Sequence, residues 1–260
     1  MPAHEEVVAS AVLAPGDRVL DVACGPGVVA ADAAVRVQPG EIVGVDLSDR
    51  MVDAARLLAQ QRQIANARFQ RMDAEQLDFA DCSFDVALCA LGLMYVPNPE
   101  QAVREMRRVL RPCGRMVIAV WGERQRCGWS ALFPIVDAEV ASEVCPLFFR
   151  LGQAETLAHL CVDAGFEVIR QRRLATIMNY ANDEEACNAA FIGGPVALAW
   201  SRFDTAARER ARSRYLEAIA PWRHQLGYRI PGEFVIVAAS VPSRARSRSP
   251  SLEPQKVESE

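Results

Sequence analysis

The chain has 260 residues, of which 51% are hydrophobic and 24% are charged, a composition typical of a globular protein with one sizeable α/β domain. Its formal net charge of −4 gives no overall basic surface, which argues against general binding to nucleic acid or to anionic membranes. Neither a membrane span nor the basic flank of a signal peptide is visible, so we expect a cytoplasmic protein.

Strand and helix patterns alternate through the first half of the chain. They predict a short helix over 5–14, strands over 18–23, 42–45, 67–72, 84–89 and 116–121, and helices over 28–38, after Ser48 and after Asn98. Ser48 and Asn98 are the expected N-caps, and Pro99 suits a first helical position. Strands that alternate with helices form a parallel sheet, whose ligands bind at the carboxyl ends of the strands.

The pattern changes after the fifth strand. We expect helical and irregular structure over 127–164, a strand over 166–180, helices over 183–220 and a last strand over 233–240. The polar, Pro-containing end of the chain is typical of a disordered tail. We therefore divide the chain into a core (1–121), a lid or substrate region with the last strands (122–241) and a tail (242–260).

The turn after the first strand is the most informative part of the sequence. Gly25 and Gly27 let a ligand approach the backbone beside the free N–H groups of a helix start. Together with Ala30 they also satisfy the dinucleotide pattern G-x-G-x-x-G/A, and Asp46 follows about 20 residues later. A nicotinamide- or flavin-linked oxidoreductase, NAD(P)-dependent for example, is therefore a rival interpretation.

Three carboxylates lie at the ends of three successive strands: Asp21, Asp46 and Asp73. An unpaired Asp21 at the glycine turn would face the doubly anionic pyrophosphate of a dinucleotide, which is unfavourable at a partly buried site. Three carboxylates instead suit a ligand that carries an ammonium, a ribose diol and an exocyclic amine. S-adenosylmethionine has all three groups and a positively charged sulfonium as well.

Five segments occur in the order and spacing of the class I S-adenosylmethionine-dependent methyltransferases. They are VLDVACGPG (19–27), VGVDLS (43–48), DAEQL (73–77), FDV (84–86) and VLRPCGR (109–115). Over about residues 17–121 the chain resembles the branch that contains the ubiquinone/menaquinone-biosynthesis and small-molecule methyltransferases. The resemblance implies an α/β fold: a Rossmann-like, doubly wound, mostly parallel seven-stranded sheet with a helical lid insertion.

The same resemblance implies roles for individual residues. Asp21 would lie near the cofactor's ammonium, Asp46 would accept hydrogen bonds from both ribose hydroxyls, and Asp73 would accept one from the adenine amine. The whole cofactor-binding set that it implies is Asp21, Ala23, Gly25, Gly27, Asp46, Leu47, Met51, Asp73, Ala74, Cys89 and Ala90. Without these neighbours, Asp46 and Asp73 would read equally well as helix or turn caps.

Two positions depart from the family pattern. Ala23 replaces the first glycine of the turn, and Cys113 stands where a glycine usually precedes strand five. If position 113 needs a positive φ, a cysteine there is strained by about 1 kcal/mol. The segment before the first strand is also short, so either the start of the chain is misplaced or truncated, or the cofactor site is unusually open. The short segment and Cys113 support the alternative of a catalytically silent methyltransferase-fold binding protein, whereas Ala23 is a tolerable variant.

The acceptor is harder to predict, because methyl transfer mainly requires that donor and acceptor be held close and aligned. No catalytic residue can be assigned, and the histidines lie outside every motif. Tyr95, just beyond strand four, and Trp121, at the end of strand five, are the expected acceptor-pocket residues, although core packing explains Trp121 equally well. Such a pocket favours a small, partly apolar metabolite. Cys127 and Cys145 could bind a soft acceptor such as a thiol or metalloid, although packing explains them equally well. No metal site is predicted.

Overall fold

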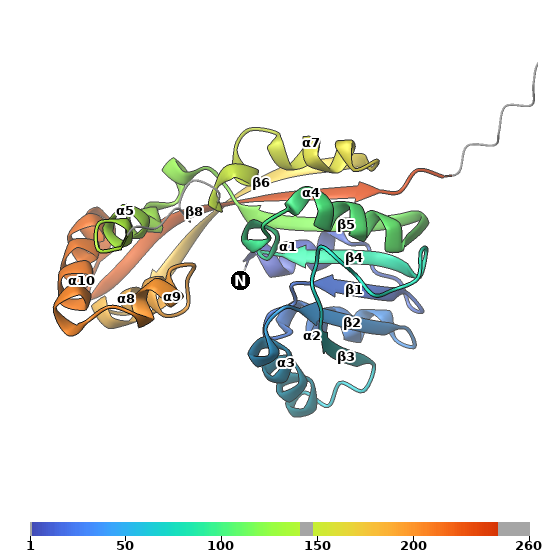
Figure 1. Ribbon diagram of the computed structural model, residues 1–260, viewed down its shortest axis with the longest axis horizontal. Coiled ribbons are helices and arrows are strands. Elements are labelled where there is room, and N and C mark those ends of the chain that lie inside the picture. The colour runs from blue at the N-terminus through green and yellow to red at the C-terminus, as the bar shows by residue number, and fades with distance from the viewer. Residues whose placement is uncertain (1, 141–147, 244–260) are drawn as a thin grey trace, which may run out of the picture.

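The computed structural model describes residues 2–140 and 148–243 (Figure 1). Its strands are β1 (Arg18–Val22), β2 (Glu41–Asp46), β3 (Ala67–Arg71), β4 (Phe84–Ala90), β5 (Leu110–Trp121), β6 (Glu167–Tyr180), β7 (Arg223–His224) and β8 (Gly227–Ser240). Its α-helices are α1 (Pro2–Ser10), α2 (Val28–Val37), α3 (Asp49–Gln61), α4 (Pro99–Val109), α5 (Leu132–Asp137), α7 (Thr156–Asp163), α8 (Asp183–Phe191), α9 (Ala197–Ser201) and α10 (Thr205–Ile219).

The strands form one sheet in the order β3-β2-β1-β4-β5-β8-β6, and the two-residue strand β7 pairs with β8. Strands β1 to β5 pair in parallel, whereas β8 runs antiparallel to both β5 and β6. The strand order reverses at β1, which lies between β2 and β4, and this is where doubly wound sheets bind their ligands. The predicted α/β fold with a mostly parallel, doubly wound sheet is confirmed.

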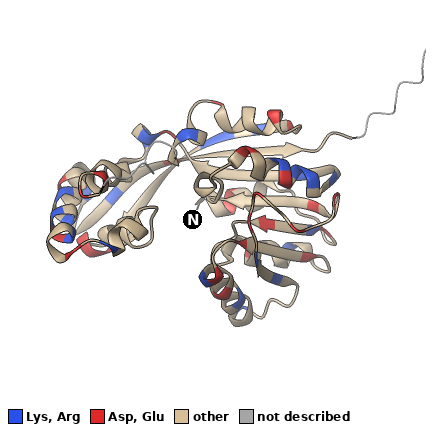
Figure 2. Cartoon of the chain, in the orientation of Figure 1, with Lys and Arg blue, Asp and Glu red and all other residues tan. Residues whose placement is uncertain are grey.

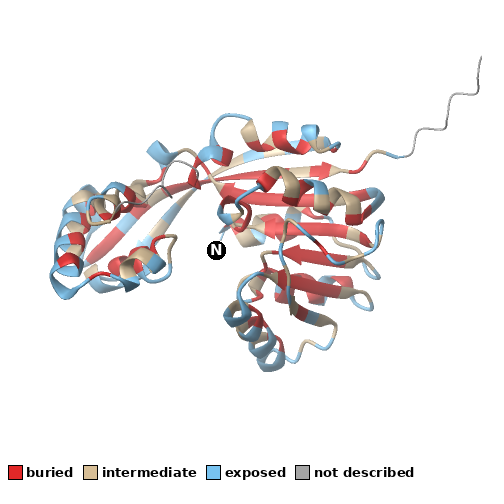
Figure 3. Cartoon of the chain, in the orientation of Figure 1, coloured by how far each residue is buried: buried red, intermediate tan, exposed pale blue. Residues whose placement is uncertain are grey.

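Both faces of the core sheet are covered, as the buried strands in Figure 3 show. Neighbouring residues of a strand point to opposite faces, so Val19 packs with α1, α2 and α3 whereas Leu20 packs with α4 and the elements beyond it. This arrangement explains the nearly continuous hydrophobic runs in β1 and β2.

The predicted helix starts are confirmed by their caps. The Ser48 side chain accepts a hydrogen bond from the Met51 N–H, and that of Asn98 accepts one from the Gln101 N–H. The fifth strand begins earlier than the sequence indicates, because Leu110 already pairs with Phe84 before an irregularity in the β4–β5 pairing.

The two unusual positions of the family pattern have left-handed backbones. Ala23 has a φ of 53° and Cys113 a φ of 63°, in a region that L-residues other than glycine rarely adopt. Position 113 thus has the positive φ at which a cysteine is expected to be strained.

The long strands β6 and β8, fourteen residues each, extend beyond the core. Their outer halves pair from Leu174–Phe234 to Tyr180–Tyr228 and carry α8, α9 and α10, which lie apart from α2 and α3 (Figure 1). We call α8 to α10, residues 183–219, the lid helices. In the part of the chain that the structure describes, no helix is long and apolar enough to cross a membrane. The tail beyond Ser243 and Cys145 lie outside the described residues.

Candidate functional site

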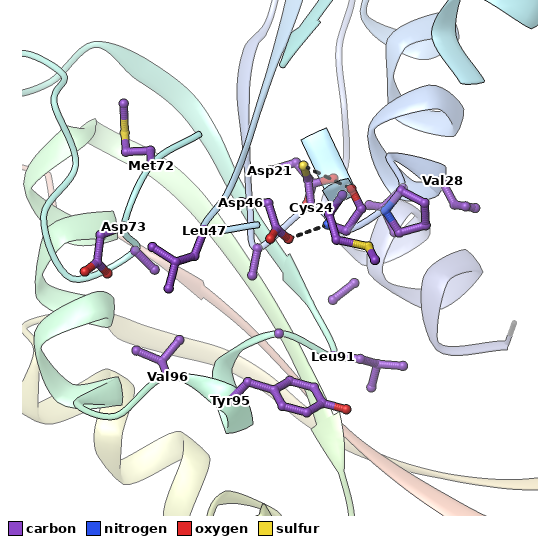
Figure 4. Close-up of a pocket in the computed structure, with 18 of the residues that line it drawn as sticks. Asp21, Cys24, Val28, Asp46, Leu47, Met72, Asp73, Leu91, Tyr95 and Val96 are labelled. Atoms are coloured by element: carbon purple, nitrogen blue, oxygen red, sulfur yellow. Dashed lines mark hydrogen bonds between the residues drawn. The ribbon is translucent and has the colours of Figure 1, made fainter. Parts of the chain in front are cut away.

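A cavity of about 480 Å³ opens at the carboxyl ends of the core strands (Figure 4). Asp21 reaches it from β1, Asp46 from the last position of β2, and Asp73 from the turn after β3. The predicted cofactor residues that line it are Asp21, Ala23, Gly25, Asp46, Leu47, Met51, Asp73, Ala74 and Ala90. The structure thus gathers residues from four strand ends around one space.

Gly27 and Cys89 do not line this cavity. A Cβ at Gly27 would lie 2.8 Å from the Cβ of Ala55, so this glycine permits close packing of α3 against the turn. Cys89 is fully buried, and burial raises the pKa of its thiol to about 12.

Asp46 joins the glycine turn to the loop after β2. Its Oδ2 accepts a hydrogen bond from the Gly25 N–H at 2.9 Å, and its Oδ1 accepts one from the Ser48 N–H at 2.9 Å. A carboxylate offers about four acceptor sites, so both oxygens retain capacity for further donors. A Cβ at Gly25 would meet no atom within 4 Å, so the space in front of the turn is open.

Asp21 is the most unusual group in the cavity wall. It is 1% exposed, and its Oδ2 atom is buried without a hydrogen-bond partner in the part of the chain that the structure describes. Burial raises the pKa of its carboxyl to about 7; the Ala30 N–H opposes this shift, and the Asp46 charge adds to it. A buried carboxylate that lacks a partner is costly, and a cation bound in the cavity would satisfy it.

The opposite end of the cavity is more exposed and more apolar. Asp73 is exposed, and its Oδ1 accepts a hydrogen bond from the Glu75 N–H at 2.9 Å, as expected of a turn cap. Leu47 is 61% exposed although it is a large hydrophobic residue, and it lies beside Met51 and Ala74 in the cavity wall. This end offers an apolar surface with an oxygen acceptor at its edge.

A second cavity of about 190 Å³ adjoins the first, and Leu91, Tyr95 and Gly194 line both. Trp121, at the end of β5, lines the second cavity, with its ring 4.7 Å from that of Trp129 and 4.3 Å from that of Phe234. Both predicted acceptor residues, Tyr95 and Trp121, therefore lie in its wall.

Several lining residues have no counterpart in the sequence motifs. His4 reaches the first cavity from α1, and burial lowers the pKa of its imidazole. Tyr180 and Tyr215 line the second cavity from β6 and α10. The Gly193-Gly194-Pro195 run marks a turn in the sequence, but nothing in the sequence places that turn against the cofactor cavity.

The cysteines in the described residues do not form a metal site. Within residues 2–140 and 148–243, no three Cys, His, Asp or Glu side chains cluster as metal ligands would. Cys127 is buried outside both cavities, and burial raises the pKa of its thiol to about 11. It therefore remains protonated at neutral pH and is a poor ligand for a soft acceptor.

Comparisons with known proteins agree with this geometry. Residues 13–182 match the family of methyltransferase domains. The ubiquinone/menaquinone biosynthesis C-methyltransferase UbiE of Ectopseudomonas mendocina is 34% identical over 169 residues, a match that covers 59% of this chain and 66% of that protein. About a third of that relative's length lies outside the match.

Solved structures show the same fold. The YcgJ protein of Bacillus subtilis superposes with a TM-score of 0.66 at 22% identity, covering 93% of this chain and 99% of that one. A putative methyltransferase of Bacillus halodurans gives a TM-score of 0.67 at 20% identity, covering 94% and 100%. These findings favour a methyltransferase over the nicotinamide-linked alternative. The chain belongs to the class I S-adenosylmethionine-dependent methyltransferases.

Proposed function

We propose that this chain transfers the methyl group of S-adenosylmethionine to a small, partly apolar acceptor. The observation that carries the proposal is the pair of adjoining cavities, one lined with carboxylates and the other with aromatic rings. In this proposal the core (1–121) holds the cofactor, and the region over 122–241 supplies most of the acceptor wall. The reaction requires the two ligands to meet where Leu91, Tyr95 and Gly194 separate the cavities.

The residues present suit the cofactor. The unpartnered Oδ2 of Asp21 would accept a hydrogen bond from its ammonium, and Asp46 would accept two from the ribose hydroxyls. Asp73 would accept one from the adenine amine, Ala74 would donate its N–H to a ring nitrogen, and Leu47 would pack against the ring. When bound, the cofactor supplies a methyl group on a positively charged sulfur that leaves readily. The protein therefore contributes mainly binding and alignment.

The acceptor is proposed to be small because the second cavity is small and largely apolar. Figure 2 shows basic and acidic residues mixed over both the core and the lid helices, and the formal net charge is −4, whereas a polynucleotide is bound by an excess of basic residues. The names of the curated relatives point to carbon methylation in quinone biosynthesis. The aromatic wall of the second cavity is compatible with a planar ring of that kind, so such a ring is one candidate acceptor.

Calorimetry with S-adenosylhomocysteine and with NADH tests the cofactor assignment. We expect binding of S-adenosylhomocysteine and none of NADH, and the reverse result would refute the proposal. Mass-spectrometric screening of a metabolite mixture, incubated with the protein and S-adenosylmethionine, then identifies the acceptor as the compound that gains one methyl group.

A further inference from the structure

The wall of the second cavity contains a hydrogen-bond donor without a partner. Trp129, in the 3₁₀-helix over Gly128–Ala131, lines this cavity and is 6% exposed. Its indole Nε1 is buried, and no hydrogen-bond acceptor among the described residues contacts it. Buried tryptophan N–H groups usually find a partner, so an unpartnered one beside a cavity indicates a missing acceptor atom.

The indole ring is held in place by its neighbours. Its centroid lies 4.7 Å from the ring of Trp121, and three phenylalanine rings surround it at 5.9, 5.9 and 5.5 Å, those of Phe133, Phe148 and Phe149. The preceding residue, Gly128, packs so closely on Trp222 that a Cβ there would lie 2.8 Å from that ring. This packing opposes rotation of the indole N–H toward another acceptor, so the donor is preorganised.

The remaining polar groups of this cavity wall are neutral. They include the hydroxyls of Tyr95, Tyr180 and Tyr215, and burial raises the pKa of Tyr180 and Tyr215 further above its ordinary value. Among the described residues that line the second cavity there is no Asp, Glu, Lys, Arg or His. A charged acceptor would therefore lose hydration here without gaining a counter-ion.

We propose that the second cavity selects a neutral acceptor that carries a hydrogen-bond-accepting oxygen, and that the Trp129 indole N–H holds this oxygen. The inference deepens the proposed function and rests on it. It parallels the first cavity, where the unpartnered Oδ2 of Asp21 awaits a donor. Trp129 is thus a specificity-determining residue: it fixes the orientation of the acceptor and has no part in the transfer itself.

Three small probes of similar shape test this selectivity. Acetophenone carries a neutral carbonyl oxygen, α-methylstyrene replaces that oxygen with a CH₂ group, and benzoate carries a charge. NMR titration measures their affinities for the protein, both alone and saturated with S-adenosylhomocysteine. We expect acetophenone to bind about threefold to tenfold more tightly than α-methylstyrene, the value of one buried hydrogen bond, and benzoate to bind most weakly.

A matched pair of variants locates the donor. Trp129→Phe removes the N–H and keeps an aromatic ring, so acetophenone should lose its advantage over α-methylstyrene. Trp121→Phe alters the same wall and should weaken both probes by a similar factor. In the wild type, one of the four indole N–H resonances should move downfield with acetophenone and stay in place with α-methylstyrene. This spectroscopic test remains available if Trp129→Phe fails to fold.

The outcomes separate the two proposals. Equal affinities of acetophenone and α-methylstyrene, or a Trp129→Phe variant that keeps the difference between them, would overturn the role of Trp129. Benzoate binding as tightly as acetophenone would overturn the selection for neutral acceptors. Absence of S-adenosylhomocysteine binding, with the probe preference intact in the unliganded protein, would contradict the proposed function alone.

Discussion

The two cavities differ in the chemistry of their walls, but each wall contains one buried polar atom that lacks a hydrogen-bond partner among the described residues. The first presents carboxylates from three strand ends, and one of them, Asp21, is buried with an oxygen that lacks a donor. The second presents aromatic rings from distant segments, and one of them, Trp129, is buried with an N–H that lacks an acceptor. One wall is thus prepared for a cation and the other for a neutral oxygen.

The difference between the cavities distinguishes a site that the fold itself provides from a site that is specific to this chain. Strand ends that converge at the edge of a parallel sheet can hold the same cofactor in any member of the fold family. The acceptor wall instead takes most of its residues from outside the core: from residues 129–132, from β6 and from the lid helices. If the two cavities bind their ligands by different interactions, then mutation, pH and salt should affect them differently.

The largest effect is expected from Asp21→Asn. The carboxyl titrates near 3.8 in the unfolded chain and near 7 in the folded one, so the folded state binds more protons between these values. Stability should therefore fall as pH rises from about 4 to about 7, and the loss is complete above that range. The variant avoids this loss and should be more stable than the wild type by about 2–4 kcal/mol at pH 8, but not at pH 4.

Urea denaturation at the two pH values measures this difference. Asp53→Asn is the control, because the Asp53 side chain is exposed and forms only a surface ion pair with Arg56. The same Asp21 variant should bind S-adenosylhomocysteine more weakly, since an amide carries no charge to pair with the ammonium. A variant that is less stable than the wild type at pH 8, or that binds S-adenosylhomocysteine as tightly as the wild type, would contradict a role for Asp21 in binding the ammonium.

The next effect concerns Asp46→Ala, which should weaken S-adenosylhomocysteine binding by one to two decades. The ribose hydroxyls would lose hydrogen bonds to a charged group, about 1.5–3 kcal/mol in total. Calorimetry measures the affinity. Asp49→Ala removes an exposed carboxylate three residues away that does not line the cavity, and it should leave the affinity within about twofold. Equal losses in the two variants would mean that Asp46 does not meet the ribose.

A smaller effect is expected from a substitution that relieves backbone strain at Cys113. Cys113→Gly should raise the free energy of unfolding by about 0.5–1 kcal/mol, because glycine adopts the left-handed φ of 63° without steric cost. Cys113→Ala keeps a Cβ and should give no such gain. Urea denaturation of both variants decides the matter, and identical stabilities would show that the Cβ at this position is not strained.

The smallest effect is that of salt on the second cavity. Raising the sodium chloride concentration from about 50 to about 500 mM should leave acetophenone binding unchanged within twofold, since no ion pair forms there. S-adenosylhomocysteine binding should weaken modestly, because part of its carboxylate surroundings is exposed to solvent. A salt dependence as steep for acetophenone as for the cofactor product would contradict the contrast between the cavities.

Most of the first cavity could be predicted from the sequence because its determinants are local. A strand followed by a turn fixes where Asp21 and Asp46 lie, and parallel strands bring such ends to one edge. The caps at Ser48 and Asn98 are also local, since each hydrogen bond spans only three residues. Tyr95 of both cavities and Trp121 of the second could be predicted for the same reason, because Tyr95 lies in the segment after β4 and Trp121 ends β5.

Apart from Tyr95 and Trp121, the wall of the second cavity could not be predicted, because it depends on contacts between distant segments. Met178 and Tyr180 reach the cavity because β6 pairs with β8, and no turn sequence fixes the register of these two strands. Trp129 and Tyr215 both line the cavity because α10 packs on the 3₁₀-helix that carries Trp129, and their separation in the sequence gives no sign of this contact. His4 reaches the first cavity through the packing of α1 on α2, which again is a tertiary effect.

The adjacent glycines of the lid have different consequences for evolution. A Cβ at Gly194 would lie 2.5 Å from the carbonyl oxygen of Ala190, whereas a Cβ at Gly193 would approach no atom more closely than 3.6 Å. Both residues line the second cavity. A lineage that adapts to a smaller acceptor can therefore fill space by mutation at position 193, whereas a side chain at position 194, which also lines the first cavity, would collide with the backbone. Two adjacent positions of the same cavity wall thus differ in the side chains that they can accept.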